Sequence, residues 1–188
     1  MNIAIFGGRF DPPHIGHWLV ARQILEKRPD IKEVWFVPAH KHQWKPILAS
    51  GKDRLAMLQS FTNKVMKVSD VELQREGVSY AVDTIKEIKK KFNHNIYWIV
   101  GSDILLEFSK WEKREKLTEL ATFLVFPRDP LLPPKKLPDG FELITGEDLI
   151  TTNLSSTAIR ERVKNKLPIT HLVPKEVEVY ITKHKLYI

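Results

Sequence analysis

Two histidines, His14 and His17, lie three positions apart near the start of the chain, soon after Gly7 and Gly8. Imidazoles with this spacing at the start of a helix lie one above the other on the same helix face. Both rings could donate hydrogen bonds to one phosphate group, and the glycine pair lets the backbone approach that phosphate closely. An arbitrary histidine pair is more often one core residue and one surface residue. The upstream glycines, together with Gly16 between the rings, favour a phosphate site.

A strand, a turn and a helix must position these rings. Residues 2–6 (NIAIF) are apolar and partly β-branched, which predicts a short buried strand that ends at the glycines. From His14 to Lys27 the apolar spacing becomes helical. The first turn of a helix offers unpaired N–H groups and a positive dipole end to an anion. The junction of strand, glycine turn and helix is therefore the expected phosphate site.

A second candidate site begins at Ser155, in the sequence SSTAIR. Its hydroxyl residues, Ser155, Ser156 and Thr157, are typical of a helix start, where side chains and backbone N–H groups can bind phosphate oxygens. Arg160 lies one turn further on, and its guanidinium group can hold a pyrophosphate leaving group. Hydroxyl caps are common, so this motif gains its meaning only when it is paired with the N-terminal histidines.

Strands and helices alternate along most of the chain. The pattern predicts strands at residues 2–6, 33–37, 65–68, 95–100 and 122–126 with a short further strand at 141–144, and helices at 14–27, 52–61, 79–92 (capped by Ser79), 111–120 (opened by Trp111), 155–166 and from Pro174 onward. Residues 39–50 and the proline-rich 127–140 are expected to be loops, and 70–77 is a polar stretch that ends in a glycine. This order predicts an α/β fold. We expect a doubly wound, Rossmann-like parallel sheet of about five strands, with helices on both faces and a C-terminal helical segment, all in one domain, 1–188.

Composition narrows the class of protein. The 188 residues are 43% hydrophobic and 28% charged, which is typical of a globular chain. The absence of cysteine excludes disulfides and thiolate metal sites. No apolar run approaches a membrane span, and no signal peptide is apparent, so a cytoplasmic protein is expected. The net charge of +7 suits nucleic acid or substrates with several phosphates, although many lysines lie on helix faces typical of solvated surface.

The motifs favour phosphate chemistry of a particular kind. The chain has neither the six-residue dinucleotide fingerprint nor a GxxxxGK[ST] loop. No carboxylate stands immediately beside the histidines, so we expect in-line attack of one phosphate on another, assisted by positioning and charge stabilisation. The attacking phosphate is already ionised, and no general base is required.

In these motifs the chain resembles the HxGH nucleotidyltransferase superfamily and, within it, the bacterial-type nicotinate-nucleotide adenylyltransferases. The matching segments are GGRFDPPHIGH (7–17), DRLAML (53–58), ELQREGVSYAVDTI (72–85), GSD (101–103), Phe108 with Trp111, FPRDP (126–130) and SSTAIR (155–160). They follow in order along nearly the whole chain.

The resemblance implies transfer of AMP from ATP to nicotinate mononucleotide, with Mg²⁺, giving nicotinate adenine dinucleotide and pyrophosphate in NAD biosynthesis. It implies that His14, His17 and Arg160 are catalytic. The implied ATP-binding residues are Gly7, Gly8, Phe10, His14, Gly16, His17, Gly101, Asp103, Arg128, Ser156, Thr157 and Arg160, with Asp103 accepting from the ribose hydroxyls. The implied acceptor-binding residues are Lys41, Lys45, Ser79, Tyr80, Ala81 and Trp111, with Trp111 stacked on the pyridine ring. No protein metal ligands are expected.

The chain departs from the family pattern in three places. They concern recognition of the acceptor and the phosphate loop, by which we mean residues 7–13, between the first predicted strand and His14. Arg9 stands where serine or threonine is commoner, and Ala81 replaces a threonine near the expected pyridine site. The loop of residues 40–45 resembles the family only loosely, so the choice of acceptor is open. A metal site at His40 and His42 would lack an obvious further ligand.

Several alternatives remain. The acceptor could be nicotinamide mononucleotide or another phosphorylated acceptor; SYAVDT (79–84) argues against phosphopantetheine. The string HIGH also opens class I aminoacyl-tRNA synthetases, but the chain lacks their KMSKS-like loop and room for an anticodon domain. A non-catalytic nucleotide- or RNA-binding protein is favoured only by the basic charge, and the aromatic–basic interleaving of single-strand binders is missing. We therefore expect no nucleic-acid or membrane partner; a homo-oligomer is compatible with the sequence.

Overall fold

The computed structural model describes residues 1–128, 134 and 136–188, which form a six-stranded parallel sheet in the order β3-β2-β1-β4-β5-β6. The strands are β1 (Asn2–Gly8), β2 (Ile31–Pro38), β3 (Met66–Val68), β4 (Asn95–Gly101), β5 (Thr122–Phe126) and β6 (Phe141–Leu143). The order runs outward in both directions from a centre between β1 and β4, as in doubly wound sheets. The predicted fold class is confirmed, and β6 is the short further strand.

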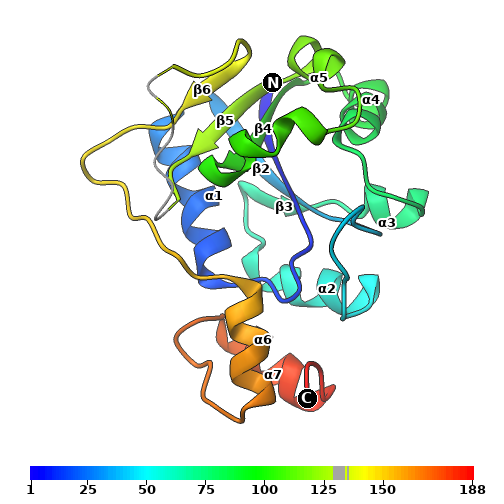
Figure 1. Ribbon diagram of the computed structural model, residues 1–188, viewed down its shortest axis with the longest axis vertical. Coiled ribbons are helices and arrows are strands. Elements are labelled where there is room, and N and C mark those ends of the chain that lie inside the picture. The colour runs from blue at the N-terminus through cyan, green and yellow to red at the C-terminus, as the bar shows by residue number, and fades with distance from the viewer. Residues whose placement is uncertain (129–133, 135) are drawn as a thin grey trace.

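Helices cover both faces of this sheet. They are α1 (Ile15–Lys27), α2 (Gly51–Leu58), α3 (Val71–Arg75), α4 (Ala81–Lys91), α5 (Arg114–Leu120), α6 (Ser156–Lys164) and α7 (Lys175–Lys183), with short 3₁₀ turns η1 (Gln59–Phe61), η2 (Ser102–Leu106) and η3 (Phe108–Lys110). Figure 1 shows α1 on one face and α4 with α5 on the other. Within the part of the chain that is described, no helix has the length and apolar character needed to cross a membrane.

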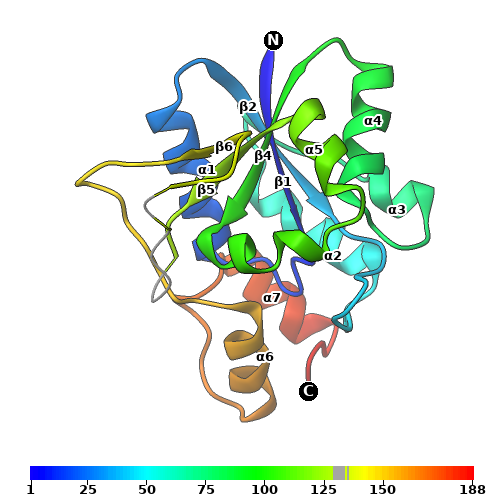
Figure 2. The same ribbon diagram turned by 45° about the horizontal axis from the view of Figure 1, so that its top comes forward.

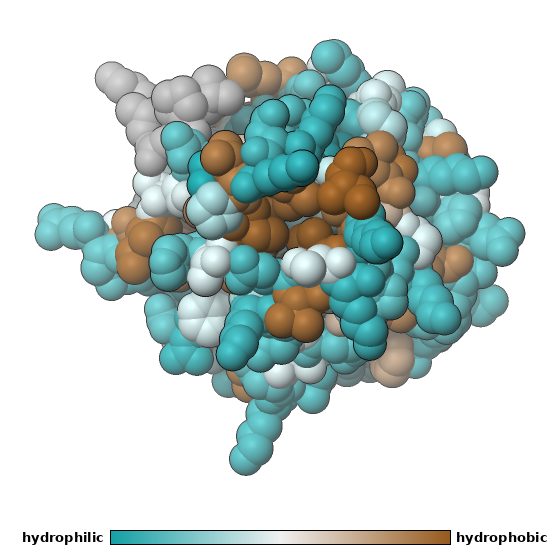
Figure 3. Space-filling view, turned by 90° about the horizontal axis from the view of Figure 1, so that it is seen from below, coloured by the Kyte–Doolittle hydropathy of each residue, from teal (hydrophilic) through white to brown (hydrophobic). Residues whose placement is uncertain are grey.

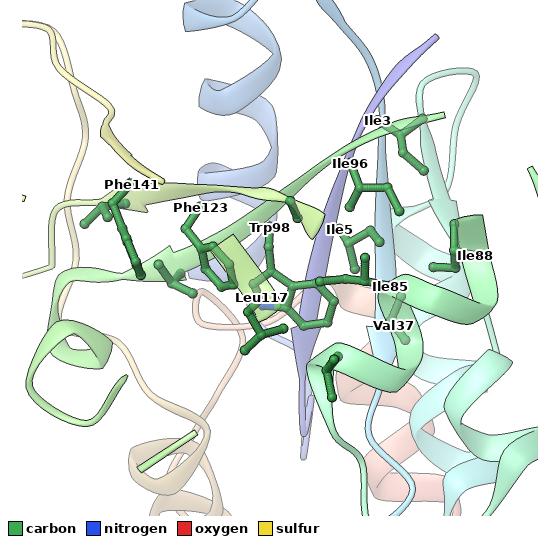
Figure 4. Packing of buried hydrophobic residues seen from close by; sticks show 14 of the residues in the cluster. Ile3, Ile5, Val37, Ile85, Ile88, Ile96, Trp98, Leu117, Phe123 and Phe141 are labelled. Atoms are coloured by element: carbon green, nitrogen blue, oxygen red, sulfur yellow. The ribbon is translucent and has the colours of Figure 1, made fainter. Parts of the chain in front are cut away.

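The alternation of side chains along β1 separates two cores. Ile3 and Ile5 point to one face and pack with Ile85 of α4 and Leu117 of α5, as Figure 4 shows. Ala4 points to the other face, into the core that contains residues of α1. These β1 side chains are completely buried, and burying one isoleucine contributes about 1.5–3 kcal/mol. The central strand of the sheet is thereby fixed from both sides.

A third apolar cluster attaches the C-terminal helices. Ile159 of α6 and Val177 and Ile181 of α7 pack with Met57 of α2 and with Ala49 just before α2. Figures 1 and 2 show α6 and α7 beyond the carboxyl ends of the strands, next to α2. The C-terminal segment is therefore held against the loops that follow the strands.

Two predicted helix starts are wrong. Helix α4 begins at Ala81, and its first turn has no side-chain cap, because the Ser79 hydroxyl instead accepts a hydrogen bond from the backbone N–H of His40, at 2.9 Å. Helix α5 begins at Arg114 rather than at Trp111, which follows the turn η3. In both places tertiary contacts engage a residue that local patterning assigned to the helix.

The polar segment 70–77, for which no helix was predicted, contains the short helix α3. Its residues are mostly polar, which hid the helix from a reading of apolar spacing. Val71 and Glu72 are nevertheless buried, and Val71 packs into the core that contains α4. The helix is thus docked by one buried apolar residue and one buried carboxyl group.

Candidate active site

Strands β1 and β4 part at their carboxyl ends. They pair only through residues 2–5 and 95–98, whereas β1 continues beside β2 as far as the pair Gly8 and Pro38. A cavity of about 360 Å³ lies where they separate. Figure 3 shows this end of the molecule, where apolar side chains gather in a hollow rimmed by hydrophilic ones. The point at which strand order reverses is the usual ligand crevice of doubly wound sheets.

The cavity gathers most of the residues predicted to form the site. Those that line it are Gly7, Gly8, His14, Gly16, His17, Lys45, Ser79, Tyr80, Ala81, Gly101, Asp103, Trp111 and Arg128. Five predicted residues are not among its lining: Phe10, Lys41, Ser156, Thr157 and Arg160. Segments separated by about a hundred residues thus meet at one crevice.

His14 and His17 form a stacked pair at the start of α1. Their ring centroids are 3.7 Å apart with planes at 29°. The backbone N–H of His14, the residue that caps the helix, donates to Nδ1 of His17 at 3.1 Å. Because Nδ1 of His17 accepts this bond, the proton of its neutral ring resides on Nε2. The second nitrogen is left as a hydrogen-bond donor on a ring that lines the cavity.

Both imidazoles are uncharged at neutral pH. Burial lowers the pKa of His14 to about 3, and the nearby Arg128 adds to the shift. The pKa of His17 is also well below its usual value, first because of burial and then because of His14 and Arg128. The rings therefore act as neutral donors, and the charge on this side of the cavity belongs to Arg128. Nδ1 of His14 is buried without a hydrogen-bond partner among the described residues.

At two glycines on this side of the cavity, other groups approach closely. A Cβ on Gly16 would lie 3.0 Å from Nδ1 and 3.1 Å from Cε1 of His14. A Cβ on Gly7 would lie 2.6 Å from the ring of Trp98. The glycine between the histidines thus leaves room for the first ring to stack on the second.

Phe10 supports the second ring from behind. It is buried in the core, and its ring meets the edge of His17 at 4.9 Å between centroids. Its φ of 49° is in the left-handed region, so the surrounding packing holds it there. The resemblance implied that Phe10 binds ATP, whereas the structure places it under the histidine.

The SSTAIR motif lies beside the segment that leads to His14. Ser155 caps α6 by accepting from the N–H of Ala158, at 3.2 Å. The hydroxyl of Ser156 donates to the carbonyl of Pro12 at 2.8 Å. Arg160 donates to the carbonyl of Asp11 at 2.7 Å and to the Thr157 hydroxyl at 3.1 Å. The two motifs are thus in direct contact.

Comparison with known proteins is consistent with this arrangement. The model of the cytidylyltransferase-like family matches residues 5–162, a span that includes both motifs. The chain belongs to this family. It is 37% identical over 192 residues to a curated protein of Halalkalibacterium halodurans and 34% identical over 196 residues to one of Bacillus licheniformis, each named as a probable nicotinate-nucleotide adenylyltransferase. The matches cover 99% of this chain and 91% and 98% of those relatives. The chain is therefore a member of the nicotinate-nucleotide adenylyltransferases, as its motifs predicted.

The fold has solved counterparts. Nicotinic acid mononucleotide adenylyltransferase of Plasmodium falciparum, solved in complex with NaAD, superposes with a TM-score of 0.80 at 23% identity. The superposition covers 99% of this chain and 97% of that one. At this identity the likeness concerns the fold.

The opposite wall of the cavity belongs to the loop 39–50 and to the segment before α4. Lys41 is not part of the cavity lining: its backbone pairs with Val78, and its carbonyl accepts from the N–H of Ser79 at 2.9 Å. His42, Trp44 and Lys45 line the cavity instead. Of the predicted loop residues, Lys45 remains available to a ligand.

Arg9 also lines this wall, and one of its guanidinium nitrogens donates to the carbonyl of Pro46 at 3.1 Å. Burial lowers its pKa, Arg160 adds to the shift, and Asp11 opposes it. The residue in which the chain departs from the family pattern thus connects the phosphate loop to the loop 39–50.

Neither His40 nor His42 belongs to a metal cluster. Nδ1 of His40 lies 3.0 Å from the carbonyl of Gly77, and Nδ1 of His42 accepts from the N–H of Trp44. Among the described residues there is no group of three or more histidine or carboxylate side chains that could hold a metal ion.

Asp103 and Arg128 also line the crevice, just beyond the ends of β4 and β5. Their side chains form an ion pair at 3.3 Å, and both are partly exposed. Trp111 is half-buried and packs against Phe108 and Phe123. The last two residues of the FPRDP motif, Asp129 and Pro130, lie outside the described residues.

Glu72 is a cavity residue that motif matching quoted without giving it a role. It is buried, accepts from the Thr84 hydroxyl at 2.5 Å, and has a raised pKa because of its burial. It also interacts with Ser79, whose hydroxyl accepts from the backbone of the loop 39–50. In the sequence, the only indication that Glu72 belongs to the site is its position in the motif ELQREG. The helix α3, which positions it, was not predicted.

Proposed function

We propose that this protein transfers AMP from ATP to nicotinate mononucleotide, forming nicotinate adenine dinucleotide and releasing pyrophosphate. The observation that supports this most directly is the neutral, stacked His14–His17 pair at the start of α1, opening into the crevice between β1 and β4. The full-length relationship to nicotinate-nucleotide adenylyltransferases supports the choice of reaction. The Plasmodium protein of the same fold was solved with NaAD, which has the size and chemistry of the expected product.

On the phosphate side, His17 donates from Nε2 to the α-phosphate of ATP, and its fixed tautomer keeps that donor available. A neutral donor retains its proton throughout, so it stabilises charge on the phosphate without acting as an acid. Arg128 and Lys45 supply positive charge from opposite walls of the cavity. The acceptor phosphate is ionised and attacks in line, so positioning and electrostatic stabilisation provide the catalysis.

On the acceptor side, the first turn of α4 opens onto the cavity at Tyr80 and Ala81. Unpaired N–H groups and the positive dipole end of a helix favour a carboxylate over an uncharged amide. This feature supports nicotinate rather than nicotinamide as the base, and it depends on backbone atoms, so alanine in place of threonine is tolerated. Trp111 is the proposed stacking surface for the pyridine ring.

A divalent metal accompanies ATP in nucleotidyltransferases of this kind, and we propose Mg²⁺. The ion enters as part of the substrate, bound to the phosphates of ATP, since the described residues offer no protein cluster for it. ATP and nicotinate mononucleotide are thus the proposed partners. That the protein is cytoplasmic and that residues 1–188 form a single domain stay predictions from the sequence. The sequence is compatible with a homo-oligomer.

Pyrophosphate release with ATP and Mg²⁺ tests the proposal. Nicotinate mononucleotide, nicotinamide mononucleotide and phosphopantetheine are compared at matched concentrations, with each acceptor also omitted as a control. We expect a clear preference for nicotinate mononucleotide. Equal or faster turnover of the amide would overturn the acceptor assignment but retain the chemistry, and no release with any acceptor would overturn both.

A further inference from the structure

The penultimate residue of the chain makes a hydrogen bond with the phosphate loop. The hydroxyl of Tyr187 donates to Oδ1 of Asp11 at 2.8 Å, across 176 positions of sequence. The side chain of Asp11 is fully buried. Burial and the neighbouring carboxylate raise the pKa of Tyr187, so its hydroxyl remains a protonated donor at neutral pH.

The carboxylate of Asp11 connects three segments. In addition to Tyr187, it accepts the backbone N–H groups of Leu48, at 2.7 Å, and of Ala49, at 3.0 Å. These two residues lie at the end of the loop 39–50. This loop and the segment before α4 form the wall of the cavity opposite the histidines, which we call the acceptor wall. One buried side chain therefore joins the phosphate loop, the acceptor loop and the end of the chain.

Arg54 interacts electrostatically with this buried carboxylate. It is itself buried, and its guanidinium donates to the carbonyl of Ala49 at 3.2 Å and to that of Arg9 at 2.8 Å. It therefore joins the same two loops that Asp11 joins. Such a charge inside a protein is stable only when it is paired and hydrogen-bonded, which fixes the loops around it.

The segment held in this way leads directly to His14, three residues beyond Asp11. The carbonyls of Asp11 and Pro12 are held in addition by Arg160 and Ser156. Tyr187 has a φ of 66°, a conformation that a residue with a side chain adopts only where its surroundings impose it. Residues of the C-terminal part of the chain thus hold both the side chain of Asp11 and the backbone carbonyls of Asp11 and Pro12.

We infer that Tyr187 is a positioning residue for the reaction: through Asp11 it holds the segment that places His14 and His17 in the cavity. This inference rests on the proposed function. Tyr187 does not line the cavity and acts only through the loop. A hydroxyl at the end of the chain thereby contributes to the geometry of the phosphate site.

The test is Tyr187→Phe, which removes the hydroxyl alone. We expect kcat to fall between about 10- and 100-fold, since displacement of a reacting group by about 1 Å can cost about 100-fold. The KM for the acceptor should change by less than about twofold, because the acceptor wall retains Arg54 and both amide bonds to Asp11. Unchanged kcat in a folded Tyr187→Phe protein would overturn the inference.

Tyr180 provides a matched control. Its hydroxyl also joins the C-terminal segment to an aspartate, Oδ1 of Asp53 on α2, at 2.9 Å. Asp53 is partly exposed, and its other bonds are to Ser50 rather than to the phosphate loop. Tyr180→Phe should keep kcat within about twofold of the wild type. An equal loss in both variants would mean that the tyrosines merely attach the C-terminal segment.

A second measurement does not depend on turnover. The ring NMR signals of His14 and His17 in the unliganded protein should shift or broaden in Tyr187→Phe and remain as in the wild type in Tyr180→Phe. If the wild type releases no pyrophosphate, the proposed function fails, while these signals still decide whether Tyr187 orders the histidines. Histidine signals unchanged in Tyr187→Phe would overturn the inference whatever the activity.

Asp11→Asn extends the test to the carboxylate itself. Both oxygens of Asp11 accept hydrogen bonds, so the NH₂ group of asparagine must face one of these donors, and the junction between the segments is broken. We expect a fall in kcat of at least the same size, and little further loss when Tyr187→Phe is added, because the tyrosine acts through Asp11. Losses that multiply in the double variant would show that the two residues act independently, against the inference.

Discussion

The two walls of the cavity are built differently. On the phosphate wall, His14 and His17 are stacked, desolvated and supported by Phe10. On the acceptor wall, the cavity-lining residues of the loop 39–50 are more exposed, and Trp44 is 48% exposed. That loop is held by backbone bonds at its two ends, through Ser79 and Asp11.

This difference suggests that the wall with the histidines serves the reaction step, whereas the wall with the loop 39–50 serves the choice of acceptor. A wall whose donors are buried and fixed in one tautomer suits a reaction step common to the family, since such donors need no reorganisation when charge develops. A wall formed by an exposed loop can change its side chains at little cost to stability. The departures at Arg9 and in residues 40–45 fall on or beside the acceptor wall. Substitutions should therefore affect kcat on one wall and acceptor KM on the other.

The largest expected effect is on the phosphate wall. His17→Ala should lower kcat by about 10²- to 10³-fold, the loss typical of one donor to a developing charge. Initial rates of pyrophosphate release at saturating substrates measure it, with circular dichroism to verify the fold. An unchanged rate would show that His17 is a packing residue.

Gly16→Ala should reduce kcat by up to about tenfold, because the new methyl group would lie 3.0 Å from Nδ1 of His14 and the ring must give way by a few tenths of an ångström. Gly146→Ala is the matched control: its methyl group meets only the ends of the Asp148 and Lys27 side chains, which can move. The same rate assay compares them. Equal rates in the two variants would contradict the requirement for close stacking.

On the acceptor side, where Trp111 is the proposed stacking surface for the pyridine ring, a substitution should change KM instead. Trp111→Ala should raise the KM for nicotinate mononucleotide by about tenfold, within the roughly 1–3 kcal/mol that aromatic stacking contributes per base. The KM for ATP should change by less than about twofold. Should the KM for ATP rise in parallel, Trp111 would belong to both walls, and the contrast between them would fail.

Titration of the two histidines should have the smallest effect on kcat. It should be detected instead in the free energy of unfolding. Both histidines are neutral down to acidic pH, so their titration should not appear in kcat between about pH 6 and 9. The pKa of His14 is about 3 in the folded state and about 6.5 when unfolded, so the unfolded chain binds the extra proton and stability falls as pH decreases through that window.

At pH 5 this costs about 2 kcal/mol for His14 relative to neutral pH. Urea unfolding at pH 7 and pH 5 measures the difference, and His14→Gln should reduce it. A kcat that follows an ionisation near pH 6.5 would instead indicate a charged histidine in the reaction.

Much of the fold could be predicted from local patterns. The strand at residues 122–126 was predicted residue for residue, and α1 within one residue, because apolar runs and helical spacing report burial directly. The helix α3 was missed, since its five residues are mostly polar and only Val71 and Glu72 are buried, which leaves no apolar stripe to detect. Ser79 was assigned as a cap because its partner, the backbone of His40, lies 39 positions away in the chain.

The sequence by itself determined the family, the phosphate chemistry and the residues of the two motifs, because these depend on residue types at short, fixed spacings. It could not reveal that the histidines are neutral, since desolvation depends on the packing around them. Nor could it reveal that SSTAIR contacts the segment before His14, or that Tyr187 reaches Asp11. Those contacts join residues 144 and 176 positions apart, and only the folded chain brings them within hydrogen-bonding distance.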